Sequence, residues 1–419
     1  MISESLVSIS ALRKLVGEAN LILNRMTIAE RLVHCLWLLG PFVFLIERSA
    51  ADIWIVTIDM AFLIRCALIR DWNWTKYFWV RTIFFFWLSL FVSSLFSSLF
   101  IYAATESFIW FRFPLLAFAF AFWFSKNSKL VEFMLLSMCA GIVLMMIILT
   151  AEIILNNPHW QSSGRLTWPY GDQVPGGYFA KFGLIISVLS ACYLSEKDKI
   201  KKLIGLSLSF LLITFVLLTG ERINSLIVLC TIAMTFSLIN YRNPQRLALF
   251  SCCILLSIAI AYLLNPFLLV KFTTSFFTGA FDIANSGYIA LWLSGIEVFK
   301  TSPFTGLGTS TYRYLCSPEL FPTGFNFACN NHNHQIYIQT LAETGIFGFF
   351  AFVIMVASLI QKLMFDGIRS KDRLKKYCYI VPFAMFFPLQ STGDLFGQWT
   401  NAFIWFGIAT ALAYSGSRE

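Results

Sequence analysis

Long apolar segments separated by short polar ones dominate the sequence. An α-helix needs about 20 mostly apolar residues to cross roughly 30 Å of hydrocarbon. Segments of this kind occupy residues 30–47, 53–69, 78–100, 107–125, 131–154, 177–195, 203–219, 223–240, 247–264, 346–364, 377–393 and 398–415. The pattern therefore predicts an all-α fold, a polytopic transmembrane helical bundle of about 12 spans.

The positions of lysine and arginine indicate which side of the membrane each connecting loop faces. Short cytoplasmic loops are enriched in these residues. When the N-terminus is placed in the cytoplasm, the inner loops receive dense basic clusters such as 197–202 and 369–376, and the outer loops receive only isolated cations. We therefore expect a multi-pass protein with both termini in the cytoplasm.

This topology divides the chain into four parts. They are a cytoplasmic N-terminal segment at 1–28, the first nine spans with an outer loop at 155–176 within 29–264, a large outer loop at 265–345, and the last three spans with a short cytoplasmic tail at 346–419. The larger loop contains a helical stretch at 288–300, followed by a turn rich in Pro and Gly. Since long ordered loops commonly carry function, we expect it to cap the outer face.

Composition agrees with a membrane protein and excludes several classes of partner. Of 419 residues, 58% are hydrophobic and 13% charged, which leaves too little polar surface to coat a soluble globule. The net charge of +9 comes from basic residues scattered over short loops, so no nucleic-acid partner is expected. The sequence contains no nucleotide-binding glycine loop, dinucleotide fingerprint or zinc-ligand spacing, and we predict neither cofactor nor metal.

The segment 331–345, directly before the span at 346–364, holds the most informative polar residues. It contains His332 and His334, two of only four histidines in the chain. The ordinary pKa of histidine lies nearest neutrality, so either residue could act as a general base on a hydroxyl group. The alternative interpretation is a polar helix start capped by Asn and His.

Two cysteines, Cys316 and Cys329, lie in the large outer loop, whereas the other eight lie in or beside predicted spans. In an oxidising compartment this pair could form a disulfide just before the histidines. The alternative is two unpaired thiols, because spacing alone does not establish a bridge.

A family signature is visible in the histidine-containing segment. The motif H-N-x-Y-L-Q-x-L-x-E-x-G of the O-antigen ligase and O-antigen polymerase superfamily resembles the run His334, Tyr337, Gln339, Leu341, Glu343, Gly345. In that family the motif ends a large periplasmic loop, just before one of the last transmembrane helices, and its position here is the same. The resemblance makes His334 the equivalent of the family's essential histidine. A literal His-Asn pair lies two residues earlier, so His332 is the alternative.

Helical geometry limits how this segment can work. At about 100° per residue, His334 and Glu343 would lie on opposite faces of a helix, whereas Gln339 and Glu343 share one. We therefore expect Glu343 to fix the loop or the helix start rather than to orient His334. Residues with a predicted substrate-binding role in this segment are His332, Asn333, Tyr337, Gln339 and Glu343.

A second resemblance concerns Arg222, in a turn similar to one where the family keeps an arginine between two helices. A guanidinium group binds phosphate oxygens bidentately and keeps its charge, which suits a lipid-linked diphosphate. The alternative is an arginine that only reaches the membrane interface. A further family arginine is replaced by Tyr288, so its charge must come from elsewhere. The candidates for added substrate binding are Arg165, Lys181 and Arg112.

The resemblance implies a glycosyltransferase at the periplasmic side of the bacterial inner membrane. Its donor would be an undecaprenyl-diphosphate-linked glycan, with His334 and Arg222 as catalytic residues and no metal or cofactor. In a ligase the acceptor is a sugar hydroxyl of lipid A-core, and in an O-antigen or exopolysaccharide polymerase it is another glycan. The alternative from another class is a lipid-linked oligosaccharide flippase or other transporter. The polar clusters lie on one side of the predicted membrane instead of at its midplane, which argues against that alternative.

Overall fold

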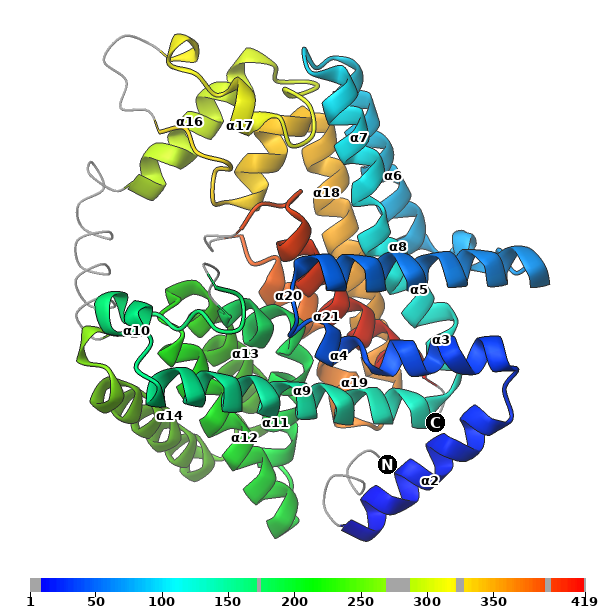
Figure 1. Ribbon diagram of the computed structural model, residues 1–419, viewed down its shortest axis with the longest axis vertical. Helices are drawn as coiled ribbons and strands as arrows, with labels where there is room; N and C mark the ends of the chain where they lie inside the picture. The colour runs from blue at the N-terminus through cyan, green and yellow to red at the C-terminus, as the bar shows by residue number, and fades with distance from the viewer. Residues whose placement is uncertain (1–8, 172–174, 269–286, 322–327, 389–392, 418–419) are drawn as a thin grey trace.

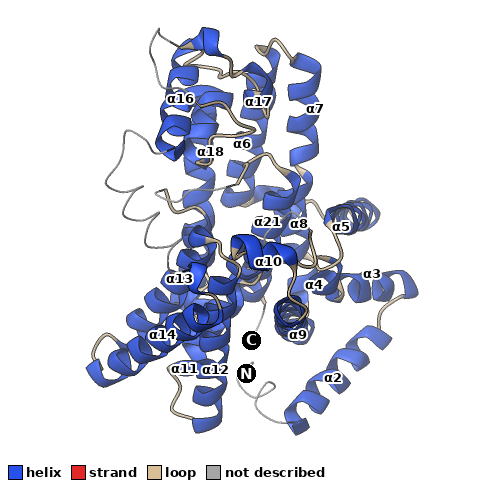
Figure 2. Ribbon diagram, turned by 60° about the vertical axis from the view of Figure 1, so that its left-hand side comes forward, coloured by secondary structure: helices blue, strands red, loops and turns tan. Residues whose placement is uncertain are grey.

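The computed structural model describes residues 9–171, 175–268, 287–321, 328–388 and 393–417. Within these ranges it contains helices and connecting turns but no strand, which confirms the all-α prediction (Figures 1 and 2). The α-helices are α2 (Ile9–Asn24), α3 (Ile28–Leu38), α4 (Gly40–Val43), α5 (Arg48–Ile69), α6 (Phe78–Leu95), α7 (Phe100–Trp110), α8 (Arg112–Phe122), α9 (Ser128–Ile154), α10 (Pro158–Ser163), α11 (Leu184–Leu194), α12 (Lys199–Leu218), α13 (Arg222–Asn240), α14 (Pro244–Leu264), α16 (Gly287–Thr301), α17 (Tyr312–Leu315), α18 (Ile336–Arg369), α19 (Arg373–Tyr377), α20 (Ile380–Met385) and α21 (Gln398–Gly416).

Seven helical segments in the described part of the chain are long and apolar enough to cross a membrane. They are Phe78–Leu95, Phe100–Lys126, Ser128–Ile154, Lys199–Leu218, Arg222–Asn240, Pro244–Leu264 and Ile336–Arg369. Each overlaps one of the predicted spans, so the polytopic character is supported. These seven segments support seven of the about 12 predicted spans. The other predicted spans, and the full count, stay predictions.

Two of the remaining predicted spans are interrupted. The segment 30–47 is divided between α3 and α4, where Pro41 at the start of α4 cannot donate a backbone hydrogen bond. The segment 177–195 is divided by Gly183 into a π-helical turn, η3 (Tyr178–Phe182), and the 11-residue helix α11. Apolarity alone does not reveal such breaks, because both halves of each segment remain mostly apolar.

The other three predicted spans are also not among the seven segments, and each has a feature of its own. The segment 53–69 forms a single helix, α5, which carries four charged residues: Arg48, Asp52, Asp59 and Arg65. The segment 377–393 includes α20 and ends in residues 389–392, which lie outside the described part of the chain. The segment 398–415 forms α21, whose residues from Asn401 to Ser415 are all buried against other helices.

The helices gather into two groups that are joined in the middle of the molecule. At one end, α6 packs beside α7 and α18, with α16 and α17 against α18 (Figure 1). At the other end, α11, α12, α13 and α14 pack against one another. The short helix α20 contacts both α13 and α18 and so connects the two groups.

Helix α18 is broken at Gly345, which has φ 64° and ψ −169°. A residue with a side chain rarely adopts this backbone conformation. The break coincides with the predicted boundary between the large outer loop, 265–345, and the following span. The first ten residues of α18 therefore belong to the predicted loop although they are helical. The predicted helical stretch at 288–300 is confirmed as α16, while 269–286 and 322–327 of the loop lie outside the described residues.

Candidate functional site

The segment that carries both predicted histidines lies between α16 and the start of α18. The buried side chain of Asn333 donates to the carbonyl oxygen of Leu291 in α16 at 3.3 Å. Gln335 caps α18, because its side-chain oxygen accepts from the backbone N–H of Ile338 at 2.8 Å. The amide nitrogen of Gln335 also donates to the carbonyl oxygen of Pro388. Asn333 and Gln335, which flank His334, are thus held by hydrogen bonds to α16 and to the chain after α20.

The two histidine rings are direct neighbours. The ring centroids of His332 and His334 are 4.1 Å apart, and both side chains are half-buried. His334 has φ 55°, a left-handed conformation that only a few per cent of non-glycine residues adopt. Tyr288 of α16, at the position where the resemblance expects an arginine, contacts His334 edge-on with ring centroids 5.6 Å apart. The structure thus brings both candidate bases into one cluster.

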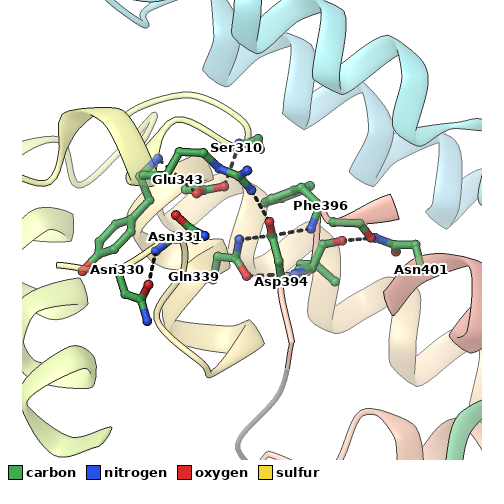
Figure 3. A network of polar contacts seen from close by, with 12 residues as sticks. Ser310, Asn330, Asn331, Gln339, Glu343, Asp394, Phe396 and Asn401 are labelled. Carbon is green, nitrogen blue, oxygen red and sulfur yellow. Dashed lines mark hydrogen bonds and ion pairs between the residues drawn. The ribbon is translucent and has the colours of Figure 1, made fainter. Parts of the chain in front are cut away.

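Tyr337 and Gln339 bind the connection that leads from α20 to α21. The hydroxyl group of Tyr337 donates to the carbonyl oxygen of Phe386 at 2.6 Å. Gln339 donates to the Asp394 carboxylate at 2.6 Å and accepts from the backbone N–H of Leu395 at 2.9 Å. Figure 3 shows Gln339 and Asp394 pointing toward one another. These contacts give both residues a scaffolding role in the structure, while their predicted substrate contacts are not tested by it.

Asp394 is the centre of this part of the network. Its carboxylate pairs with the guanidinium of Arg313 and also accepts from the backbone N–H of Phe396 at 2.9 Å (Figure 3). Asn401 donates to the carbonyl oxygen of Leu395 and so fixes the same turn from α21. Arg313 and Asp394 thereby join the large loop to the last connection between helices. Sequence reasoning did not pair them, because 81 residues separate them.

The Glu343 carboxylate fixes the large loop. It is fully buried and accepts from the backbone N–H of Ser310 at 2.8 Å and of Tyr312 at 3.2 Å (Figure 3). The Glu343 carbonyl oxygen accepts from the hydroxyl of Ser93 and the N–H of Gly308. This is the loop-fixing role that helical geometry favoured for Glu343. Close by, burial raises the pKa of the Tyr312 hydroxyl above its usual range.

The turn rich in Pro and Gly, residues 302–308, fills the break in α18. The N–H of Leu307 donates to the carbonyl oxygen of Ala342 at 3.0 Å, and the N–H of Ile346 donates to the carbonyl oxygen of Pro303 at 2.9 Å. The loop therefore satisfies backbone groups that the break leaves without helical partners. A Cβ atom at Gly345 would overlap the backbone of Phe304. We call residues 302–312 with 342–346 the interlock.

The two cysteines of the large loop form a disulfide in the structure. Their Cα atoms are 5.7 Å apart, and 13 positions separate Cys316 from Cys329 in sequence. The bridge joins the end of α17 to the start of the segment that carries the histidines. No group of three or more His, Cys, Asp or Glu side chains suited to a metal ion occurs among the described residues.

Three of the predicted cations gather around the start of α13. The turn before α13 lies against the outer loop at 164–165, since a Cβ atom at Gly220 would lie 3.1 Å from Cγ of Arg165. Lys181, in η3, donates to the side-chain oxygen of Asn224 at 3.4 Å. Arg222 is the first residue of α13, with Glu221 as its N-cap. We call Arg165, Lys181 and Arg222 the cationic cluster.

Within the described part of the chain, neither Arg165 nor Arg222 forms an ion pair. The Glu221 carboxylate partly balances the positive charge of Lys181, because the Asn224 side chain accepts from Lys181 and donates to Glu221. Among the described residues, no carboxylate within ion-pair distance thus balances either arginine. The loop that carries Arg165 is itself anchored by Glu152, whose buried carboxylate accepts from the N–H of Thr167 and of Trp168, each at 2.9 Å. Glu152 is a carboxylate near the end of a mostly apolar helix, and this signal was not used in the sequence analysis.

Arg112, the fourth predicted cation, lies elsewhere. Its Nε donates to the Asp52 carboxylate at 2.7 Å, and its Nη1 donates to the carbonyl oxygen of Ile109 at 2.7 Å. The ion pair with α5 accounts for its charge, so the structure does not join Arg112 to the cationic cluster.

The helices that begin at Arg222 and just after His334 both contact α20. Helix α20 packs against α13, which begins at Arg222, and against α18, which begins two residues after His334. Gln335 and Tyr337 reach the chain just after α20, at Pro388 and Phe386. Among the described residues, no hydrogen bond or ion pair joins the cluster directly to either histidine ring.

Comparison with known protein families gives a match over part of the chain. Residues 207–353 match the family model described as O-Antigen ligase. The match runs from within α12 to within α18, so it includes Arg222, the interlock and both histidines, and excludes Arg165, Lys181 and Arg112. No curated protein matches the chain. The family match confirms the resemblance seen in the sequence: residues 207–353 form an O-antigen ligase family domain, in a chain whose described part has seven helical segments long and apolar enough to cross a membrane.

Proposed function

We propose that this protein is an O-antigen ligase-like glycosyltransferase. It moves a glycan from undecaprenyl diphosphate to a sugar hydroxyl of lipid A-core at the periplasmic side of the inner membrane. Its chain crosses that membrane about 12 times, with both termini in the cytoplasm and the loops at 155–176 and 265–345 in the periplasm. The observation that carries the proposal is that α13, which begins at Arg222, and α18, which begins just after the histidine pair, both pack against the short helix α20, and that Arg222 and Arg165 form no ion pair among the described residues.

His334 acts as the general base. Its imidazole takes the proton from the acceptor hydroxyl, and the resulting oxygen attacks the anomeric carbon of the donor sugar. A new C–O glycosidic bond forms as the bond between the anomeric carbon and the diphosphate oxygen breaks. The rings of His332 and Tyr288 lie against His334 and hold the imidazole in place.

Arg222 and Arg165 stabilise the departing undecaprenyl diphosphate. Negative charge builds on the diphosphate oxygen as the glycosidic bond breaks, and cations held in place stabilise that charge more in the transition state than in the ground state. Lys181 adds a third cation from η3. The reaction needs no nucleotide, because the diphosphate-linked donor is already activated.

Purified protein in detergent micelles tests this proposal. We expect transfer of a labelled glycan from undecaprenyl diphosphate to lipid A-core without ATP. The variants His334→Ala and Arg222→Ala should each lower the rate by at least about a hundredfold, the usual size of a general-base or charge-stabilising contribution. Arg112→Lys should keep most of the activity, because Lys can also pair with Asp52. Unchanged transfer by His334→Ala would reject its assignment, and a loss seen only with His332→Ala would reassign the base.

A deletion strain separates ligase from polymerase. Undecorated lipid A-core together with accumulated long polymer indicates a ligase. Lipid A-core that carries a single repeat unit indicates a polymerase, which would use a second lipid-linked glycan as acceptor. Transport of the intact lipid-linked glycan without any bond exchange would instead indicate a flippase.

A further inference from the structure

Helix α17 is fixed by contacts with α18 and with the connection before α21. The N–H of Tyr312 donates to the Glu343 carboxylate at 3.2 Å, and the Tyr312 side chain packs in a small apolar core that includes Ala342 of α18. The next residue, Arg313, pairs with Asp394 in the connection before α21. The short helix α17 is therefore a firm attachment point in the large loop.

The segment 328–334, which carries the histidine pair, is attached to α16 by hydrogen bonds. The N–H of Ala328 donates to the hydroxyl of Ser294 at 2.9 Å, and the Asn333 side chain donates to the carbonyl oxygen of Leu291 at 3.3 Å. Three of the four residues between Ala328 and Asn333 are exposed. These hydrogen bonds thus hold the segment near its two ends, and both lead to the same helix.

The disulfide attaches the same segment to a second element, α17. Cys316 directly follows α17, and Cys329 is the second residue of the segment. A covalent link between positions 13 apart removes much of the conformational freedom of the chain that it closes. His334, five residues after Cys329, has φ 55°, a conformation that a non-glycine residue keeps only where its surroundings determine it. The histidine pair therefore lies in a segment that α16 and α17 constrain together.

The bridge is accessible to small thiols from the solvent. Cys329 is exposed and Cys316 is half-buried, so a dithiol reductant can reach the bridge in the folded protein. The other eight cysteines of the chain are free thiols. Reduction therefore breaks this one bond and no other.

We propose that the Cys316–Cys329 disulfide positions the histidine pair, so that glycan transfer depends on the oxidised state of the bridge. A dithiol reductant attacks one sulfur atom of the bridge. The S–S bond breaks, the two cysteines take up two electrons and two protons to become thiols, and the reductant becomes a disulfide. The segment 328–334 then loses its attachment to α17, and the imidazole of His334 is held less well at the distance that proton transfer needs.

The effect on transfer rests on the proposed function. A chain whose cysteines are still reduced would be nearly inactive, and formation of the bridge in an oxidising compartment would activate it. The effect on the segment 328–334 itself does not depend on the reaction, so it can be measured separately.

Reduction of the folded protein tests the proposal. Full-length protein in detergent micelles is treated with dithiothreitol, and alkylation followed by mass spectrometry verifies that both cysteines have become thiols. We expect faster amide hydrogen exchange in residues 328–335 and unchanged exchange in α9 and α13. The kcat for glycan transfer should fall about tenfold to a hundredfold, as expected for a misplaced catalytic group, with KM for both substrates within about twofold. Reoxidation with oxidised glutathione should restore the slow exchange and the transfer rate together.

Substitutions give an independent check. Cys316→Ser should behave like the reduced protein before any reductant is added, and dithiothreitol should not change it further. Cys252→Ser is the matched control, because Cys252 is an exposed free thiol in α14. It should keep the full transfer rate and the same sensitivity to dithiothreitol as the unmodified protein.

Three outcomes would overturn the proposal. They are unchanged exchange in residues 328–335 after complete reduction, faster exchange that extends equally to α9 and α13, and faster exchange in 328–335 with an unchanged transfer rate. His334→Ala separates this proposal from the proposed function, since it should lose transfer and keep the effect of reduction on exchange. An oxidised protein that transfers nothing contradicts the proposed function, whereas faster exchange of 328–335 on reduction of that protein still supports positioning of the segment by the bridge.

Discussion

At the scale of single residues, two buried carboxylates fix the loops beside the residues of the proposed reaction. Glu152 and Glu343 are each 1% exposed or less, and each accepts hydrogen bonds from two backbone N–H groups of a loop. Burying a carboxylate is costly unless such bonds compensate for lost hydration. Glu152 thereby anchors the loop with Arg165, and Glu343 anchors the loop that fills the break in α18. Both glutamates are positioning residues in the proposed reaction.

The substitution Glu343→Gln tests this anchoring. A glutamine side chain has one acceptor oxygen and an NH2 group, so it cannot accept from both Ser310 and Tyr312 as the carboxylate does. We expect a loss of about 1–3 kcal/mol in the free energy of unfolding, the cost of leaving a buried donor unpaired. Thermal unfolding of the detergent-solubilised protein measures it. Glu297→Gln is the control, because Glu297 pairs with the exposed Lys300, and this substitution should change the free energy of unfolding by less than about 1 kcal/mol. Equal effects of the two substitutions would contradict the anchoring role.

At the scale of elements, the interlock explains why a helix is broken next to the proposed site. If α18 were continuous, its first turns would lie in line with the part of the helix that follows Gly345. The break at Gly345 lets the turn at 302–308 insert, and that turn supplies the partners for Ala342, Glu343 and Ile346. The first part of α18 is thus held at a fixed angle, which sets where its cap, Gln335, and the adjacent His334 lie.

Gly345→Ala should damage the interlock. The backbone there has φ 64° and ψ −169°, a region almost restricted to glycine that costs another residue about 1–3 kcal/mol, and the added methyl group would also meet the backbone of Phe304. We expect faster proteolysis within 302–316 and strongly reduced glycan transfer, with the protein still inserted in the membrane. Gly17→Ala is the control. Gly17 lies in α2 with open space around it, so its replacement should stabilise the helix by about 0.5–1 kcal/mol and leave transfer intact. An unaltered digestion pattern for Gly345→Ala would mean that the interlock does not hold the loop.

At the scale of the whole molecule, the proposed reaction needs the cationic cluster and the histidines on one side of the membrane. Segments far apart in sequence meet around α20: α13, α18, and the chain between α20 and α21. The basic loops at 197–202 and 369–376 follow the predicted spans at 177–195 and 346–364. They are expected on the cytoplasmic side of the membrane, opposite the proposed site. From the positive-inside rule we therefore expect Arg165, Arg222 and His334 to lie in the periplasm.

Reporter fusions test that assignment. Alkaline phosphatase, which is active only outside the cytoplasm, should be active when fused after residue 170 or after residue 330. Green fluorescent protein, which fluoresces only inside, should fluoresce when fused after residue 198 or after residue 372. We expect each pair of sites to behave alike. Residues 170 and 330 on different sides of the membrane would be incompatible with a shared site for Arg222 and His334.

The sequence by itself determined the features that depend on local composition and on short spacing. Continuous apolarity predicts helices wherever a segment prefers lipid or a helical core to water, and the described structure has helices at 131–154, 203–219, 223–240 and 247–264 as expected. The motif around His334 and the turn before Arg222 were recognisable for the same reason, because each lies within a few consecutive residues. The match of residues 207–353 to the O-antigen ligase family confirms the family resemblance inferred from these residues.

Only the tertiary structure decided which polar groups meet. Arg112 pairs with Asp52 across 60 positions, Arg313 with Asp394 across 81, and the Ser93 hydroxyl with the Glu343 carbonyl across 250. Burial makes each of these groups need a partner, but which partner it finds depends on how distant helices pack, and local sequence does not encode that packing. The same holds for the break at Gly345, since the 302–308 turn that satisfies its backbone lies more than 30 residues away.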